Sequence, residues 1–326
     1  MQRETIALIV CSFVITATAM AHAATPAEYP NRPIRMIVAF APGGGTDIIG
    51  RIAAKGIGDN LNAQVVVDNR PGAGGNIGTE IVAKSVADGY TLVTAGTGTH
   101  AINPSLYPNI PYDAVNDFAP VCLVAATPYL MVVNLSVPAR SVKEFIALAK
   151  ASPDKINMAS SGSGGMPHLS GELFSMMTGI KMVHVPYKGT GAVFPDLIGG
   201  RVQVTFGDIV ATLPHVKAEK LRALGVTSPR RISSLPDIPT IAESGVPGYD
   251  AVGWFGVLAP ARTPKSIITR LNGAIVKYVK QPDVAERLAA LGAEVVASTP
   301  EQFREIQIAD LARWGKVVRQ SGARVE

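Results

Sequence analysis

The sequence contains little cysteine, few aromatic side chains and little charge. Of its 326 residues two are cysteines, 6% are aromatic and 17% are charged. Cys11 lies in the apolar N-terminal stretch, so Cys122 has no partner for an internal disulfide once that stretch is removed. The neighbours of Cys122, APVCLVAA, predict a buried thiol. With 47% hydrophobic residues, the chain is expected to fold around apolar cores and not to depend on disulfides.

Long apolar runs are also missing after the N-terminus, where no stretch reaches the roughly 18 uncharged residues of a membrane helix. The first 23 residues combine Arg3, an apolar core and the sequence AHA at 21–23, which is the pattern of a signal peptide. The apolar core, Thr5 to Ala21, is shorter than the ~20 residues that span a bilayer. We therefore expect export, with cleavage near Ala23/Ala24.

Clustered positive charge is absent as well. The net charge is +5, but the Lys and Arg residues are scattered, without a run of three and without interleaved aromatic residues. This distribution excludes a nucleic acid as the expected partner and favours anions only through a weak overall field.

The stretch FAPGGGTD, residues 40–47, has three glycines but matches no nucleotide-binding motif. No lysine follows it as in a phosphate-binding loop, and the dinucleotide pattern G-x-G-x-x-G counted from Gly43 ends on Ile48. We therefore expect no nucleotide and no other cofactor.

The features of an enzyme are weak. The loop SSGSGG, residues 160–165, lacks the glycine that a nucleophile elbow would need at Ser161, and Ser163, His168 and Asp208 form only a chance trio. His168 and Glu172 lie four residues apart, and two ligands do not complete a metal site. A secreted hydrolase using Ser163 or His168 is the enzyme alternative, but we expect no catalysis and no metal.

What the sequence does contain is a regular alternation of strand-like and helix-like segments. A first series predicts strands at 34–40, 63–69 and 90–96 around helices at 47–61 and 76–87, and a second series follows after residue 120. Such βαβ alternation predicts two α/β lobes, each with a mostly parallel sheet and helices on both faces. The second series consists of strands at 155–160, 181–187, 201–208 and 220–228 and helices at 141–151, 167–179 and 192–200.

The end of the chain has a different pattern. An irregular Pro/Gly-rich stretch at 235–249 is followed by a predicted strand at 251–260 and three helical segments. We assign residues 24–125 to lobe 1 and residues 126–232 to lobe 2, with residues 233–326 returning to lobe 1. The two crossings would form a two-strand hinge that can close on a ligand.

Glycine-rich loops end three of the predicted strands, at 41–47, 95–99 and 160–165. A glycine loop that opens a helix leaves amides free and favours an anion, and a carboxylate fits there as well as a phosphate. Asp47 has two interpretations: it pairs with Arg51 one turn later, or it contacts a ligand. The loops carry the hydroxyls of Thr46, Thr97, Thr99, Ser161 and Ser163.

The ordered set of segments resembles the Bug family, the periplasmic solute-binding proteins of tripartite tricarboxylate transporters. The similar segments are YPNRPIRMIVAFAPGGGTD, VVVDNRPGAGGNIGTEIVAKSVADGYTLV, GTHAINPSLYPNIPYDAVNDFAPV, HLSGELF, VHVPYKG, LRALGVTS and WFGVLAPARTP. They cover essentially the whole mature chain. The resemblance implies a two-lobe, type II Venus-flytrap binding protein that is periplasmic, non-enzymatic and monomeric. It also implies a small carboxylate ligand, namely a di- or tricarboxylate, an amino acid or an aromatic acid, and membrane subunits as partners.

The resemblance also implies a ligand site between the first glycine loop and the facing lobe. Two departures from the family pattern, Gly207 before Asp208 and Met166-Pro167 before His168, fall where selectivity is expected. A ligand-sensing module for a membrane receptor would use the same cleft, so the sequence leaves this alternative open. The expected ligand-binding residues are Phe40, Gly44, Thr46, Asp47, Thr97, Thr99, Ser161, Ser163, His168 and Asp208.

Overall fold

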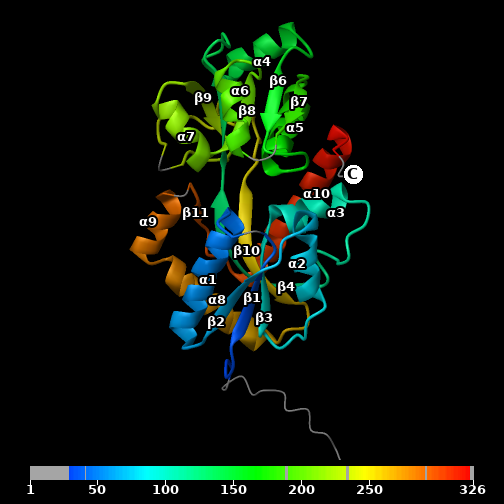
Figure 1. Cartoon of the computed structure of the whole chain (residues 1–326), viewed down its shortest axis with the longest axis vertical. Coiled ribbons are helices and arrows are strands. Elements are labelled where there is room, and N and C mark those ends of the chain that lie inside the picture. Colours follow the sequence, from blue (N-terminus) through cyan, green and yellow to red (C-terminus); the bar gives the residue numbers. More distant parts are fainter. Residues whose placement is uncertain (1–28, 41, 188–189, 233–234, 291, 324–326) are drawn as a thin grey trace, which may run out of the picture.

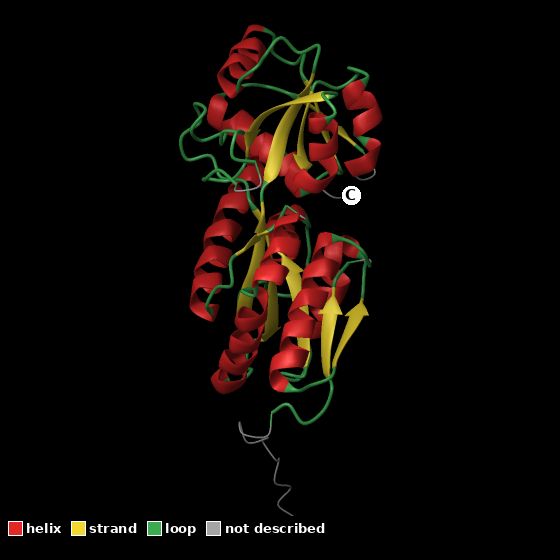
Figure 2. Cartoon of the chain, turned by 90° about the vertical axis from the view of Figure 1, so that its left-hand side faces the viewer, coloured by secondary structure: helices red, strands yellow, loops and turns green. Residues whose placement is uncertain are grey.

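The computed structural model describes residues 29–323 except 41, 188–189, 233–234 and 291. The predicted signal peptide and its cleavage site lie outside the described residues. Figure 1 shows two lobes stacked along the long axis, and Figure 2 shows helices flanking the strands of each lobe. The two-lobe α/β fold predicted from the sequence is confirmed.

Each lobe is built around one sheet. The first sheet has the strand order β11-β4-β10-β3-β1-β2 and the second the order β7-β6-β8-β5-β9. The first sheet consists of β1 (Ile34–Val38), β2 (Val65–Asn69), β3 (Thr91–Gly96), β4 (Phe118–Thr127), β10 (Gly253–Pro260) and β11 (Glu294–Val295). The second consists of β5 (Tyr129–Asn134), β6 (Asn157–Ser160), β7 (Val183–Pro186), β8 (Val204–Asp208) and β9 (Leu221–Val226).

Both sheets are mixed, and the crossing strands are the reason. β1 pairs in parallel with β2 and β3, and β6 pairs in parallel with β7 and β8. β4 leaves lobe 1 and β10 returns to it, so the two run antiparallel. β5, which enters lobe 2 directly after Pro128, is antiparallel to β8 and β9. The predicted parallel βαβ units are therefore present, but the prediction of mostly parallel sheets was wrong, because the strands that cross between the lobes pair antiparallel with their neighbours.

Helices cover both faces of each sheet. Against the first sheet, α1 (Gly45–Leu61) and α8 (Lys265–Val279) share one core, and α10 (Pro300–Ser321) belongs to a second core. A Thr299–Gln302 capping box starts α10, and Ser141 caps α4 by accepting the Glu144 amide. The remaining helices are α2 (Asn76–Ala83), α3 (Asn103–Leu106), α4 (Val142–Ala151), α5 (Met166–Thr178), α6 (Phe194–Ile198), α7 (Ile209–Lys217) and α9 (Pro282–Ala290).

The apolar clusters differ in whether they cross from one lobe to the other. On the α10 side a single cluster runs from lobe 1 into lobe 2 and includes Trp314 and Phe303 of α10 and Phe174 of α5. On the α1 side the two lobes have separate clusters. Cys122 is buried, as predicted. Because apolar contact is continuous on one side only, the α1 side is where the lobes are separated by open space.

The helix α7 and the turn that leads into α3 were absent from the sequence-based prediction. α7 follows Asp208 directly and contains Pro214, which removes an amide donor and weakens the helical pattern. A π-helical turn at Gly98–Ile102 leads from β3 into α3. Both begin at the carboxyl end of a strand, on the side of the sheet that faces the other lobe.

Candidate functional site

The first glycine loop connects β1 to α1. Gly44 is the N-cap residue of α1, in extended conformation, and no side chain caps the helix there. Gly43 has φ +88°, a conformation that favours glycine. The first-turn amides of a 17-residue helix are therefore left without a side-chain acceptor, as the glycine loop predicts.

Asp47 fastens this loop from behind. One carboxylate oxygen, Oδ2, accepts from the Gly43 amide at 2.9 Å and from Arg51 Nε at 3.0 Å. The other, Oδ1, accepts from Asn69 Nδ2 at 2.9 Å, and Asn69 also donates to the Phe40 carbonyl. Burial by itself would raise the pKa of Asp47, but these hydrogen bonds outweigh it and lower the pKa to about 2. Both oxygens thus have partners within the protein, and Asp47 is only 3% exposed.

The two threonines after β3 are also engaged by the protein. Thr97 Oγ1 accepts from the backbone amide of Trp254 at 2.8 Å and so ties the turn to the returning strand β10. Thr99 Oγ1 donates to the Gly96 carbonyl at 3.2 Å and lies 2.9 Å from His100 Nδ1. Both residues are buried, as is Thr46 in the first turn of α1. The hydroxyls of Thr97 and Thr99 thus stabilise the turn after β3.

The loop SSGSGG of lobe 2 leads into α5, which begins after the N-cap Gly165 without a side-chain cap. Ser163 is exposed and Ser161 half-buried. His168 Nδ1 accepts from the Gly164 amide at 3.0 Å, and its ring stacks on His184 with 3.6 Å between centroids. Burial, with the nearby His168, lowers the pKa of His184 to about 4. The His168 ring therefore supports the loop from within lobe 2.

This second loop touches lobe 1. Gly164 has φ +75°, and a Cβ there would collide with the side chain of Leu106 at the end of α3. The SSGSGG loop is thus placed against the opposite lobe. The ring of Phe40 packs beside Gly75, ahead of α2.

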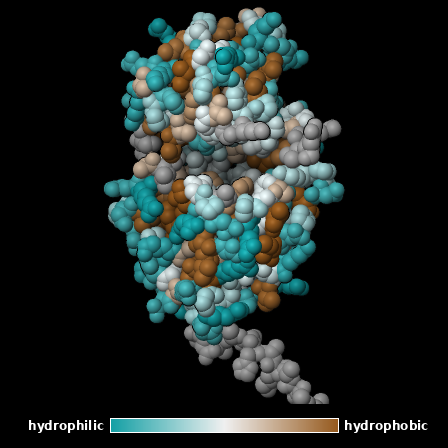
Figure 3. Space-filling model, in the orientation of Figure 1, coloured by the Kyte–Doolittle hydropathy of each residue, from teal (hydrophilic) through white to brown (hydrophobic). Residues whose placement is uncertain are grey.

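A pocket of about 310 Å³ lies between the lobes on the α1 side, which we call the front pocket. Figure 3 shows the surface hollowed between the two lobes. Of the expected ligand-binding residues Asp208 lines this pocket, and Gly45 beside Gly44 contributes from α1. The lining comprises Gly45, Ile48, Ile49, Thr127, Tyr129, Asp208, Ile209, Val210, Phe255 and Ala293.

The sequence-based reasoning missed most of this lining. Ile209 and Val210 belong to α7, which was not predicted. Thr127 and Tyr129 flank the crossing at Pro128. Pro128 separates the two apolar stretches that form β4 and β5. Its position was the signal that could have marked its neighbours Thr127 and Tyr129.

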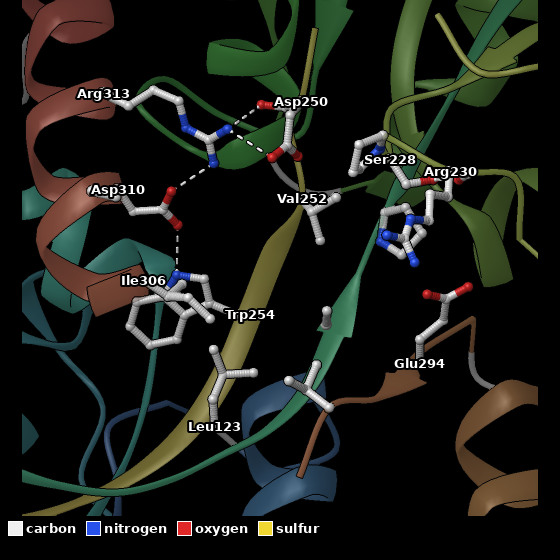
Figure 4. Close-up of a pocket in the computed structure, with 15 residues that line it drawn as sticks. Leu123, Ser228, Arg230, Asp250, Val252, Trp254, Glu294, Ile306, Asp310 and Arg313 are labelled. Carbon is white, nitrogen blue, oxygen red and sulfur yellow. Dashed lines mark hydrogen bonds and ion pairs between the residues drawn. The ribbon is translucent and has the colours of Figure 1, made fainter. Parts of the chain in front are cut away.

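A larger pocket of about 480 Å³ lies on the other face of the crossing strands, beside α10, and we call it the rear pocket. Figure 4 shows its interior charges joined to one another: Trp254 Nε1 donates to Asp310, and Arg313 pairs with Asp310 and Asp250. None of the expected ligand-binding residues lines it. Although the rear pocket is larger, its lining does not include the start of α1 or of α5, where the backbone amides have no side-chain cap.

Among the described residues, no group of three His, Cys, Asp or Glu side chains is arranged to hold a metal ion. No helix among the same residues has the length and apolar composition needed to cross a bilayer.

Similarity to known proteins identifies the family of the chain. The sequence profile described as "Tripartite tricarboxylate transporter family receptor" matches residues 49–323. The chain belongs to this family. Among curated proteins, this receptor is 40% identical to protein BugT of Bordetella pertussis over 320 residues, which is 98% of each chain.

Solved structures of the family match about nine tenths of the chain. Rpa4515 of R. palustris, solved with adipate, has a TM-score of 0.77 and 38% identity, and the match covers 91% of this chain and all of that one. MatC of Rhodopseudomonas palustris, solved with malate, has a TM-score of 0.73 and 31% identity, with 89% and 100% covered. The receptor thus has the two-lobe fold of a periplasmic solute-binding protein.

Proposed function

We propose that the receptor captures a small carboxylate in its interlobe cleft and delivers it to the membrane subunits of a tripartite transporter. The observation that carries this proposal is the uncapped start of α1 at Gly44, which borders a pocket lined by both lobes. Open amides at the positive end of a long helix bind a carboxylate well. Export to the periplasm and cleavage near Ala23/Ala24 belong to the same proposal.

Two relatives support the ligand class. Rpa4515 and MatC were solved with adipate and malate, and both ligands are small carboxylates. In this chain Thr127 Oγ1, beside the front pocket, has no hydrogen-bond partner among the described residues. A ligand oxygen would satisfy it.

We assign two kinds of role to the expected site residues. Gly44 and the amides that follow it, with Ser161, Ser163 and Asp208, are proposed to face the ligand. The side chains of Asp47, Thr97, Thr99 and His168 are proposed to position the loops, since each is bonded to protein atoms. Phe40 and Thr46 contribute backbone groups to the first loop.

Capture follows from population shift. A ligand that contacts both lobes only when they are close favours the closed state by the difference between its affinities for the two states. The membrane subunits would then recognise the closed form. We infer binding and not catalysis because His168 Nδ1 is already occupied by the Gly164 amide, so this ring nitrogen is not available as a base for Ser163.

The test is a thermal-shift screen of the mature chain against di- and tricarboxylates, amino acids and aromatic acids. At a hundredfold excess over Kd, a ligand should stabilise the protein by about 2.7 kcal/mol. Gly44→Val should abolish the shift, because a branched side chain would cover the open amides. The variant should still fold, because the φ of −79° at Gly44 is allowed for valine. Stabilisation by neutral sugars or cations alone would refute the proposal.

The matched control is Gly273→Val. Gly273 lies on the exposed face of α8, with open space around it. This variant should lose some helix stability but keep its ligand shift. Equal affinity in wild type and Gly44→Val would remove the first loop from the site.

A further inference from the structure

The wall of the front pocket is mainly apolar. Ile48 and Ile49 come from α1, Ile209 and Val210 from α7, and Phe255 from β10. Val210 is 49% exposed, which is unusual for a large aliphatic side chain. A ligand with only polar groups would leave these side chains facing its oxygens, whereas an apolar body would cover them and gain from their burial.

The two lobes meet directly at the rim of this wall. A Cβ at Gly292, in the segment before β11, would lie 3.0 Å from Ile209 Cβ. This contact lies beside the pocket, whose lining includes Ile209 and Ala293 and whose volume of about 310 Å³ is at the small end of ligand pockets. A compact body fits here, and a long acyl chain does not.

The charge of the pocket is unevenly distributed. Asp208 is the acidic residue of the lining, and among the described lining residues there is no Lys or Arg. Thr190 Oγ1 donates to Asp208 Oδ2 at 2.7 Å. Tyr129 stays protonated, since burial and then the nearby Asp208 raise the pKa of its phenol. The α1 end of the pocket thus attracts a carboxylate, while the Asp208 end repels one.

We propose that the ligand of this receptor is a compact carboxylic acid with an apolar body and without a second carboxylate at its far end. The inference rests on the proposed function. The carboxylate lies at the start of α1, the body lies against Ile48, Val210 and Phe255, and any far group is a hydroxyl or amine that donates to Asp208. This ligand class separates the receptor from Rpa4515 and MatC, which were solved with dicarboxylates.

The first test measures affinities of the mature chain by calorimetry for phenylacetate, 4-methylpentanoate, adipate, malate and citrate. We expect the two apolar monocarboxylates to bind at least about tenfold more tightly than the three others. Tighter binding of adipate, malate or citrate would overturn this inference while leaving the proposed function intact. If no carboxylate of any kind binds, the proposed function falls, and the inference with it.

The second test uses Asp208→Asn, which keeps an oxygen acceptor for Thr190 and removes the charge. Adipate should then bind about tenfold more tightly, with little change for phenylacetate. The control Asp237→Asn removes the same charge from an exposed position that is not in the pocket lining. It should change neither affinity. Unchanged or weaker adipate binding in Asp208→Asn would show that Asp208 does not exclude a second carboxylate.

The third test addresses the wall. Val210→Asn should weaken phenylacetate binding about tenfold, because the amide replaces an apolar contact, and should affect malate far less. Since Val210 is half exposed, the variant should fold normally, which a melting curve verifies. Equal losses for both ligands would argue against an apolar contact at this position.

Discussion

The front and rear pockets lie on opposite faces of the same two hinge strands. In β4, Ala126 lines the rear pocket and Thr127 the front; in β10, Trp254 lines the rear and Phe255 the front. Neighbouring residues point to opposite faces because side chains alternate along a strand. The two hinge strands therefore form a wall that the two pockets share.

The two pockets differ in whether their polar groups are already paired with other groups of the protein. In the rear pocket Arg313 joins Asp310 and Asp250, while Arg230 and Glu294 are exposed at the rim. In the front pocket the helix start at Gly44 has no side-chain cap. The larger volume is thus at the rear and the open binding groups are at the front, so pocket volume and available binding groups favour opposite sides.

The same contrast holds for the cores. The α10 side has one apolar cluster shared by both lobes, and Tyr249 donates to the Ser170 carbonyl there at 2.9 Å. The α1 side has two clusters with the front pocket between them. We infer that the rear side is the fixed side of the hinge and the front side the one that opens. Damage at the rear should reduce stability, and damage at the front should reduce ligand binding.

The largest expected effect is the loss of Arg313. Arg313→Ala leaves Asp310 buried without its cation, which should destabilise the protein by about 2–4 kcal/mol in urea unfolding. The control Lys316→Ala, one turn further along α10 and exposed, should cost well under 1 kcal/mol. Ligand affinity of the folded Arg313→Ala protein should stay near that of wild type. A large loss of affinity with little loss of stability would invert the proposed difference between the two sides.

Asp47 provides the next effect, through pH. A folded-state pKa of about 2, against the ordinary 3.8, gives stability that is present above pH 4 and is lost as the pH falls toward 2. That depression corresponds to about 2 kcal/mol. Asp47→Asn should therefore be less stable than wild type at pH 7, and the difference should shrink in urea titrations at pH 2–3.

The same variant also tests the front pocket. The carboxamide keeps only one acceptor oxygen, so the Gly43 amide, Arg51 and Asn69 cannot all keep their hydrogen bonds to this side chain. This loss should loosen the first loop and weaken ligand binding at pH 7 several-fold. A stability difference that does not change between pH 7 and pH 2 would contradict the assigned ion pair. Unchanged ligand affinity would show that the loop does not need this support.

Local patterns predicted much of the lobes but little of the pocket between them. The strand at 34–40 and the helix at 47–61 follow from apolar periodicity and are present as Ile34–Val38 and Gly45–Leu61. The pairing of Asp47 with Arg51 follows from their spacing and is observed at 3.0 Å. The contact of Asp47 with Asn69 depends on which strand pairs with β1, and spacing along the chain does not encode it.

The apolar wall shows why the rest was not predictable. Val210 becomes a pocket residue only because α7 starts at the carboxyl end of β8 and faces α1 of the other lobe. In the sequence, the stretch IVATLPHVK is short and contains a proline, so neither the helical nor the strand pattern of apolar residues is evident. Contacts across the cleft depend on how the two lobes pack. A single sequence does not show that residues about 160 positions apart, such as Ile48 and Val210, lie close together.

The smallest expected effect lies between the two sides. Thr97→Val removes the acceptor of the Trp254 amide at the point where the returning strand passes from the rear to the front pocket. Leaving this buried amide unpaired should cost about 1 kcal/mol and should speed hydrogen exchange at Trp254 about fivefold or more. Thr97→Ser keeps the hydroxyl and should retain most of the protection. Because the hydrogen bond joins the turn after β3 to the hinge, we expect Thr97→Val to weaken ligand binding slightly. The ion pairs of Arg313 with Asp310 and Asp250 should not change. If exchange at Trp254 does not change, the hinge strand is held by its sheet pairing alone, and the front and rear sides are coupled through β10 without this threonine.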